Sequence, residues 1–133
     1  MNEAIRIDRL ASVILSVTDQ DRAIDFYVGT LGMQKVADLP YGDGERWVEV
    51  APAGAATTIA LARPPQSVEP QRGGSCISFE VDDVNAMHAQ LRERGVDVDP
   101  EVLRLPPPVP AMFFFRDPDG NPLLIVERSR ERA

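Results

Sequence analysis

The sequence has one cysteine, one histidine and one tryptophan among its 133 residues, and aromatic residues make up only 6%. A single cysteine excludes an intrachain disulfide. No apolar run near its start is typical of a signal peptide or a membrane span, so we expect a cytoplasmic protein. Basic residues are outnumbered, with 14 Lys and Arg against 21 Asp and Glu and a net charge of −7. Such an acidic chain is not expected to bind nucleic acid or an anionic membrane.

The sequence does contain enough apolar residues for a core, at 44%, and a motif that occurs twice. In the first copy, an alternating strand over residues 13–17 runs into Asp19, whose short side chain is suited to cap a helix. The helix then ends at Gly32. Residues 77–95 repeat this order of strand, capping Asp, amphipathic helix and Gly.

The similarity continues beyond the helices. Residues 46–54 resemble residues 112–120, since in both an alternating strand leads into a Pro-x-Gly turn and then into a second apolar strand. This alignment places Trp47 opposite Phe113 in the other copy. The sequence therefore predicts an α+β fold built from two copies of βαβββ.

The two copies are expected to cover about 8–64 and 74–128, within a single domain over residues 1–133. Residues 65–73 are rich in proline and glycine and are predicted to be a surface linker. A second proline-rich tract, 105–110, cannot enter a sheet interior because proline lacks the N–H group, and we expect an extended rim there.

Together these motifs resemble the vicinal oxygen chelate superfamily, the group of glyoxalases, bleomycin-resistance proteins and extradiol dioxygenases. The resemblance covers about 8–128 and implies two βαβββ modules whose strands curve into a half-open barrel around a cup, with a homodimer completing the sites. The residues that carry it are Val17, Asp19, Arg22, Ala23, Phe26, Tyr27, Leu31 and Gly32, then Phe79, Val81, Asp83, Val84 and Gly95, and finally Asp117, Pro118, Asp119, Gly120 and Asn121.

Enzymes of that superfamily hold a divalent metal with four side chains, mostly His and Glu. The resemblance places those four positions on Ser12, Ala60, Cys76 and Leu124. This set lacks the carboxylate and imidazole donors that a divalent cation needs. We therefore expect no metal at the family site and no cofactor.

Strand alternation predicts which side chains line the cup. The predicted ligand-binding residues are Trp47, Glu49, Phe113, Phe115, Ser12, Ile14, Cys76 and Leu124, with Ser16, Thr58, Glu80 and Val126 beside them. Such an aromatic-walled cavity suits a small, flat molecule. Alternatively, the rings close the barrel and leave no cavity.

Glu49 and Glu80 are the only candidates for catalysis. Two carboxylates in one cup can share a proton and act as acid and base. They are equally compatible with solvated side chains or with ion pairs to Arg46 or Arg116. The one histidine, His88, falls on the sheet-facing side of the second helix, so a pair with Cys76 is not expected.

Three functional classes remain open. The first is a metal-free protein that binds a small aromatic or cationic molecule, as drug-sequestering members of the superfamily do. The second is a lyase, isomerase or dioxygenase-type enzyme with a rebuilt metal site or carboxylate acid–base chemistry. The third is a non-catalytic regulatory or interaction module.

Overall fold

The computed structural model describes residues 4–63 and 76–128. The chain forms two compact units, of which residues 4–63 and 76–128 are the described parts. We call the unit that contains residues 4–63 the first unit and the one that contains residues 76–128 the second unit. Each is an open, four-stranded mixed sheet with one helical segment, so the predicted α+β fold of two βαβββ modules is confirmed. The predicted linker 65–73 lies outside the described residues.

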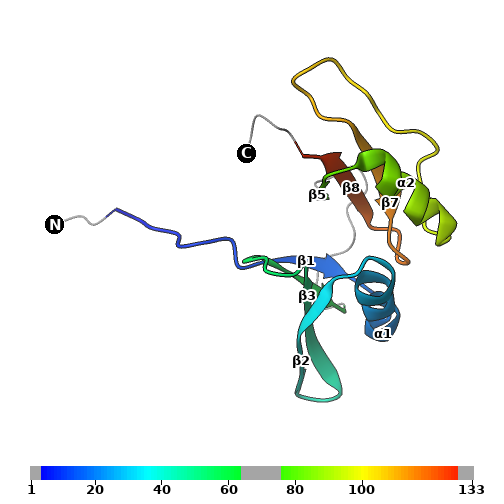
Figure 1. The fold of residues 1–133 in the computed structure, drawn as a ribbon. Coiled ribbons are helices and arrows are strands. Elements are labelled where there is room, and N and C mark those ends of the chain that lie inside the picture. Colours follow the sequence, from blue (N-terminus) through cyan, green and yellow to red (C-terminus); the bar gives the residue numbers. More distant parts are fainter. Residues whose placement is uncertain (1–3, 64–75, 129–133) are drawn as a thin grey trace. The chain divides into compact units, whose positions relative to one another are not determined.

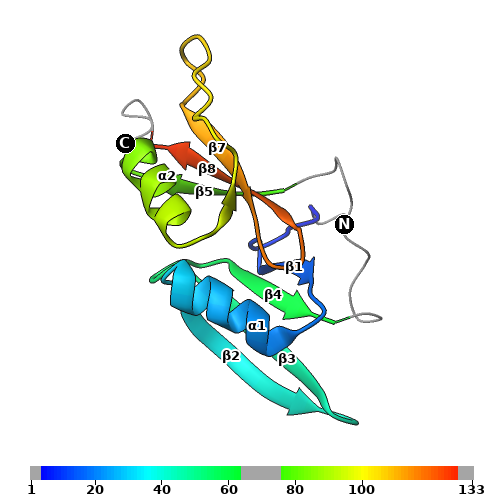
Figure 2. The ribbon, with the colours of Figure 1, turned by 90° about the vertical axis from the view of Figure 1, so that its right-hand side faces the viewer.

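The first unit has the strand order β1-β4-β3-β2, with β1 parallel to β4 and the other neighbours antiparallel. Its helix lies across one face of the sheet (Figure 2). That helix begins as α-helix and continues as a wider π-helical segment. The elements are β1 (Ser12–Ser16), α1 (Gln20–Ile24), η1 (Asp25–Thr30), β2 (Gln34–Tyr41), β3 (Glu45–Ala51) and β4 (Thr58–Ala62).

The second unit repeats this arrangement with the strand order β5-β8-β7-β6. Here β5 and β8 are parallel, and the equivalent of β2 is reduced to a strand of two residues. The helix again runs beside the sheet (Figure 1). The elements are β5 (Ile77–Val81), α2 (Val84–Glu93), β6 (Asp97–Val98), β7 (Met112–Arg116) and β8 (Pro122–Glu127).

The helix ends follow from the residues that flank them. Asp19 accepts a hydrogen bond from the backbone N–H of Arg22 at 3.0 Å, and Asp83 caps α2 in the same way. Each cap satisfies a backbone donor that the first turn leaves without a helical partner. Gly32 and Gly95 both have a φ of 77°, a left-handed conformation that costs glycine little.

The core of each unit lies between the helix and the sheet. Val17, Tyr27 and Val50 are fully buried in the first unit. In the second, Phe113 and Phe115 are fully buried, and the Phe113 ring meets the His88 ring of α2 edge to face at 4.9 Å. His88 is thus a core side chain on the sheet-facing side of its helix, as predicted.

The proline-rich tract 105–110 does not form an extended rim. Leu103 and Met112 pair as an isolated antiparallel bridge, and the backbone N–H of Val109 donates to the carbonyl of Pro106 at 3.2 Å. The chain therefore turns back on itself here and returns to the start of β7. None of the helices in the described residues is long and apolar enough to cross a membrane.

Candidate functional site

Strand β3 presents two different faces. Val48 and Val50 are buried, whereas Trp47 and Glu49 are only partly buried and point to the opposite side. We call this side of the sheet, turned away from α1, the distal face of the first unit. Strand alternation puts Ser12, Ile14 and Thr58 on the same face.

Glu49 is held on the distal face by two uncharged donors. The indole N–H of Trp47 donates to Oε2 of Glu49 at 2.6 Å, and the hydroxyl of Thr58 donates to Oε1. These bonds, with that of Thr58 as the larger contribution, hold the pKa of Glu49 below its usual value of 4.5. Both favour the ionised form of the carboxylate. Glu49 is therefore a carboxylate at neutral pH.

No basic side chain of residues 4–63 or 76–128 forms an ion pair with Glu49. Burial raises the pKa of Glu49, and the positive charge of Arg9 lowers it by less than the two hydrogen bonds do. The Arg9 guanidinium itself donates to the carbonyl of Ala56 at 3.0 Å. Within the described parts of the chain, Glu49 thus has no ion-pair partner, and it lies beside an indole ring whose orientation the hydrogen bond fixes. Ile14, 47% exposed, adds an apolar side chain to this face.

The second unit differs from the prediction. Phe113 and Phe115 do not point away from the helix: both are fully buried, and Phe113 packs against His88 of α2. The expectation that these two rings face the cup is therefore wrong. The partly buried Phe114 occupies the opposite face, where it pairs with Leu124.

A shift of one residue explains the error. Glu49 pairs with Ala60 in the first unit, and Phe114 pairs with Leu124 in the second, so Glu49 and Phe114 are equivalent. The alignment of the two Pro-x-Gly turns had placed Trp47 opposite Phe113 instead. The turn follows its strand one residue later in the second unit, and a slip of one residue exchanges the two faces of a strand.

Ser16 is buried at the end of β1, and the remaining predicted residues lie in the second unit. Glu80 accepts a hydrogen bond from Nε of Arg128 at 3.1 Å, and Asp82 lies 3.3 Å from the same guanidinium. Neither Arg46 nor Arg116 is the partner of Glu80. Cys76 is a free, partly buried thiol just before β5.

The resemblance to the superfamily places its four metal ligands at Ser12, Ala60, Cys76 and Leu124. A hydroxyl, a methyl group, a thiol and an isobutyl group do not suit a divalent cation that needs several oxygen or nitrogen ligands. Across the described parts of both units, no group of three or more His, Cys, Asp and Glu side chains is placed to hold a metal ion.

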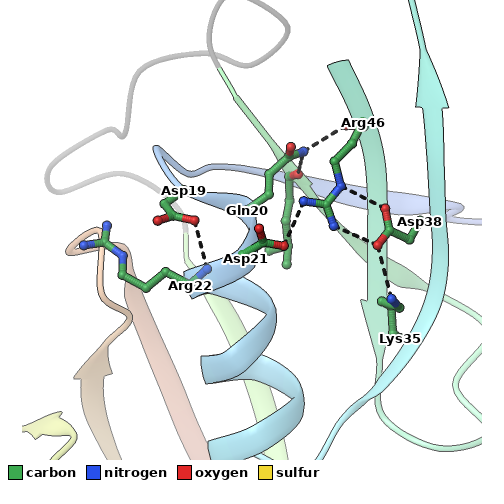
Figure 3. A network of polar contacts seen from close by, with 8 residues as sticks. Asp19, Gln20, Asp21, Arg22, Lys35, Asp38 and Arg46 are labelled. Atoms are coloured by element: carbon green, nitrogen blue, oxygen red, sulfur yellow. Dashed lines mark hydrogen bonds and ion pairs between the residues drawn. The ribbon is translucent and has the colours of Figure 1, made fainter. Parts of the chain in front are cut away.

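Sequence reasoning missed Gln20, the first residue of α1. Its side-chain amide donates to the carbonyl of Arg46 at 2.8 Å and to that of Leu61 at 2.9 Å (Figure 3). Next to it, Asp21 accepts from the Arg46 guanidinium at 2.9 Å, and Asp38 accepts from the same group twice. No sequence pattern indicates the bonds that join α1 to the sheet, because those of Gln20 and Asp21 link residues 25 and more positions apart.

Two βαβββ units with open mixed sheets define a glyoxalase-like fold. Residues 6–125 match the sequence model of the Glyoxalase/Bleomycin resistance protein/Dioxygenase superfamily. The chain belongs to this superfamily.

The chain is also similar to proteins of known sequence or structure. The chain is 30% identical to the Bacillus subtilis protein YetH over 91% of this chain and 99% of that protein. It is 36% identical to TnmS3, an antibiotic-binding protein from Streptomyces sp. CB03234, over 95% of this chain and all of that one, with a TM-score of 0.78. A superfamily member from Sphaerobacter thermophilus is 35% identical over 92% of this chain and 98% of its own, with a TM-score of 0.79.

Proposed function

We propose that this protein binds a small planar cation on the distal face of its first unit, through Trp47 and Glu49. The observation that carries the proposal is the Glu49 carboxylate, which is anchored by the neutral donors Trp47 and Thr58 and left without an ion-pair partner among the described residues. A cation bound there gains the charge of Glu49 and the face of the adjacent indole. Attraction between a cation and an aromatic face contributes about 0.5–2 kcal/mol.

The antibiotic-binding description of TnmS3 supports a binding role, because that protein is similar to this chain over nearly its whole length. The pKa of Glu49 supports the same choice over acid–base catalysis. A general base that works near neutral pH needs a carboxyl pKa that is raised, whereas that of Glu49 is lowered by its hydrogen bonds. Glu80, the other candidate, is engaged by Arg128.

The proposal also covers the oligomeric state of the protein and its place in the cell. We infer a cytoplasmic homodimer that binds no nucleic acid and in which each chain, 1–133, acts as one glyoxalase-like domain. The support is the net charge of −7 and the edge strands of both sheets, since strands at sheet edges carry unpaired backbone groups that a second chain can cover. Light scattering at micromolar concentration tests the dimer, and a monomer would contradict it.

Trp47 provides the test of binding because it is the only tryptophan. The purified protein is titrated with acriflavine as a planar cation, anthraquinone sulfonate as a planar anion and tetramethylammonium as a cation without rings. Affinity is measured by calorimetry, and Trp47 emission is followed in parallel. We expect acriflavine to bind most tightly and to change the emission. No binding of acriflavine, or binding that leaves Trp47 emission unchanged, would contradict the proposal.

A further inference from the structure

We infer that Gln20 is a positioning residue for Trp47: its amide holds strands β3 and β4 apart at a fixed distance directly before the indole. The inference rests on the proposed function for its consequence on binding. Its structural part, the orientation of Trp47, stands independently and is measured without any ligand.

Strands β3 and β4 pair only at Glu49 with Ala60 and at Val50 with Ile59. Towards the start of β3 the ladder stops, so the carbonyls of Arg46 and Leu61 need other partners. The Gln20 amide supplies both donors, at 2.8 Å and 2.9 Å. One planar NH₂ group therefore bridges the two strands where their own hydrogen bonds end.

The bridge acts on the residue that precedes Trp47. Gln20 is only 7% exposed, so its amide has no access to water as an alternative partner to these two carbonyls. The two bonds fix the peptide group between Arg46 and Trp47 relative to β4, and β4 carries the Thr58 hydroxyl that binds Glu49. The indole of Trp47, the carboxylate of Glu49 and the hydroxyl of Thr58 are thereby held in fixed positions relative to one another.

The Arg46 side chain adds a weaker second link (Figure 3). It is paired with Asp38 on β2 and with Asp21 on the first turn of α1. The Asp21 side chain is 80% exposed, and an exposed ion pair contributes little. The Gln20 amide is therefore the principal connection from the helix to this end of β3.

Over residues 76–128 the second unit shows no such bridge and no such gap between its strands. Its strands β7 and β8 pair continuously from Met112 with Val126 to Arg116 with Pro122. The interrupted ladder occurs in the unit whose distal face carries Trp47 and Glu49. This contrast favours a role for Gln20 in the site over a general requirement of the βαβββ module.

The experiment compares Gln20→Met with His88→Met. His88 offers a matched control, since its Nε2 lies 2.7 Å from the Asp99 carbonyl and it too is a buried side chain bonded to the backbone, but in the second unit. Both substitutions remove such a bond and insert the same side chain. Trp47 emission and its quenching by acrylamide are recorded without ligand, under conditions in which each variant is folded by circular dichroism. Acriflavine affinity follows by calorimetry.

We expect Gln20→Met to change the emission and to increase quenching, and to weaken acriflavine binding about three- to tenfold, the loss expected from one or two hydrogen bonds. His88→Met should lower thermal stability and leave both Trp47 readouts unchanged. If Gln20→Met does not fold, Gln20→Asn replaces it: the shorter amide cannot reach both carbonyls, and the emission should change in the same direction.

Emission and quenching equal to wild type in a folded Gln20 variant would overturn the inference and make Gln20 a purely structural residue. An equal change in His88→Met would overturn it as well. Failure of the proposed function looks different, because wild-type protein would then not bind acriflavine while the effect of Gln20→Met on Trp47 emission would persist.

Discussion

The two units of this protein have equivalent strand orders, and each buries the helix-facing side of its sheet, but the faces turned away from the helix differ. At the position where the first unit carries Glu49, the second carries Phe114. The same alignment of β3 and β7 places Met112 where the first unit has Trp47. The helix-facing side is apolar in both, with Val48 and Val50 in one unit and Phe113 and Phe115 in the other. The repeated fold thus requires only the helix-facing pattern, and the other face is free to carry chemistry.

The comparison extends to the backbone. In the second unit β7 and β8 pair at five consecutive positions, whereas β3 and β4 pair at two. The shorter ladder coincides with the polar cluster and with the Gln20 bridge. We infer that the Gln20 amide replaces regular strand pairing there and so fixes the position of Trp47. If the first unit binds the ligand and the second is structural, substitutions at equivalent positions of the two units should have different effects.

The largest expected effect concerns stability. Phe113→Ala should lower the free energy of unfolding by about 3–5 kcal/mol, because it leaves a cavity in a fully buried site against His88. Phe114→Ala should cost clearly less, since Phe114 is only partly buried. Urea unfolding followed by circular dichroism measures both. Equal losses would contradict the assignment of Phe113 to the core and of Phe114 to the opposite face.

The next effect concerns binding. Trp47→Ala should weaken acriflavine binding about tenfold or more, from the lost ring contact together with the lost burial. Met112→Ala, the equivalent change in the second unit, should leave the affinity unchanged. Calorimetry on both folded variants makes the comparison, and a larger loss in Met112→Ala would place the ligand on the other unit.

A smaller effect is expected in acid. The hydrogen bond from Arg46, with a further one from Lys35, lowers the pKa of Asp38 from 3.8 to about 2. Because the folded-state pKa is below the unfolded one, this contribution to stability is present above pH 3.8 and is lost as the pH falls towards about 2. The urea midpoint of Asp38→Asn should depend less on pH in this window than that of wild type. Parallel curves for the two proteins would contradict the role of this pair.

Much of the fold could be predicted from the sequence, because local signals decide it. Asp19 and Asp83 cap the helices, Gly32 and Gly95 end them, and strand alternation indicates the buried faces. The distal position of Trp47 and Glu49 followed from the same alternation. These features depend on neighbours within one turn or one strand.

The errors arise where distant segments meet. The sequence prediction put Phe113 and Phe115 on the wrong face of β7, because it aligned the two units by their turns and not by their paired strands. A slip of one residue exchanges the two faces of a strand. The partner of Glu80 is Arg128, which joins it through side chains 48 positions apart. The bonds of Gln20 to β3 and β4 are likewise long-range. Such contacts depend on strand register and on the position of the backbone. Neither can be obtained from the composition of the chain or from the periodicity of its apolar residues.

The most direct test of the central claim is the affinity of Glu49→Gln for the two dyes of opposite charge. Glutamine keeps the size of Glu49 and removes its charge, so acriflavine binding should weaken about fivefold while anthraquinone sulfonate does not bind more weakly. Glu80→Gln, which removes a carboxylate already paired with Arg128, should change neither affinity. If Glu49→Gln binds acriflavine as tightly as wild type does, or if Glu80→Gln shows the loss instead, the distal face of the first unit is not the binding site.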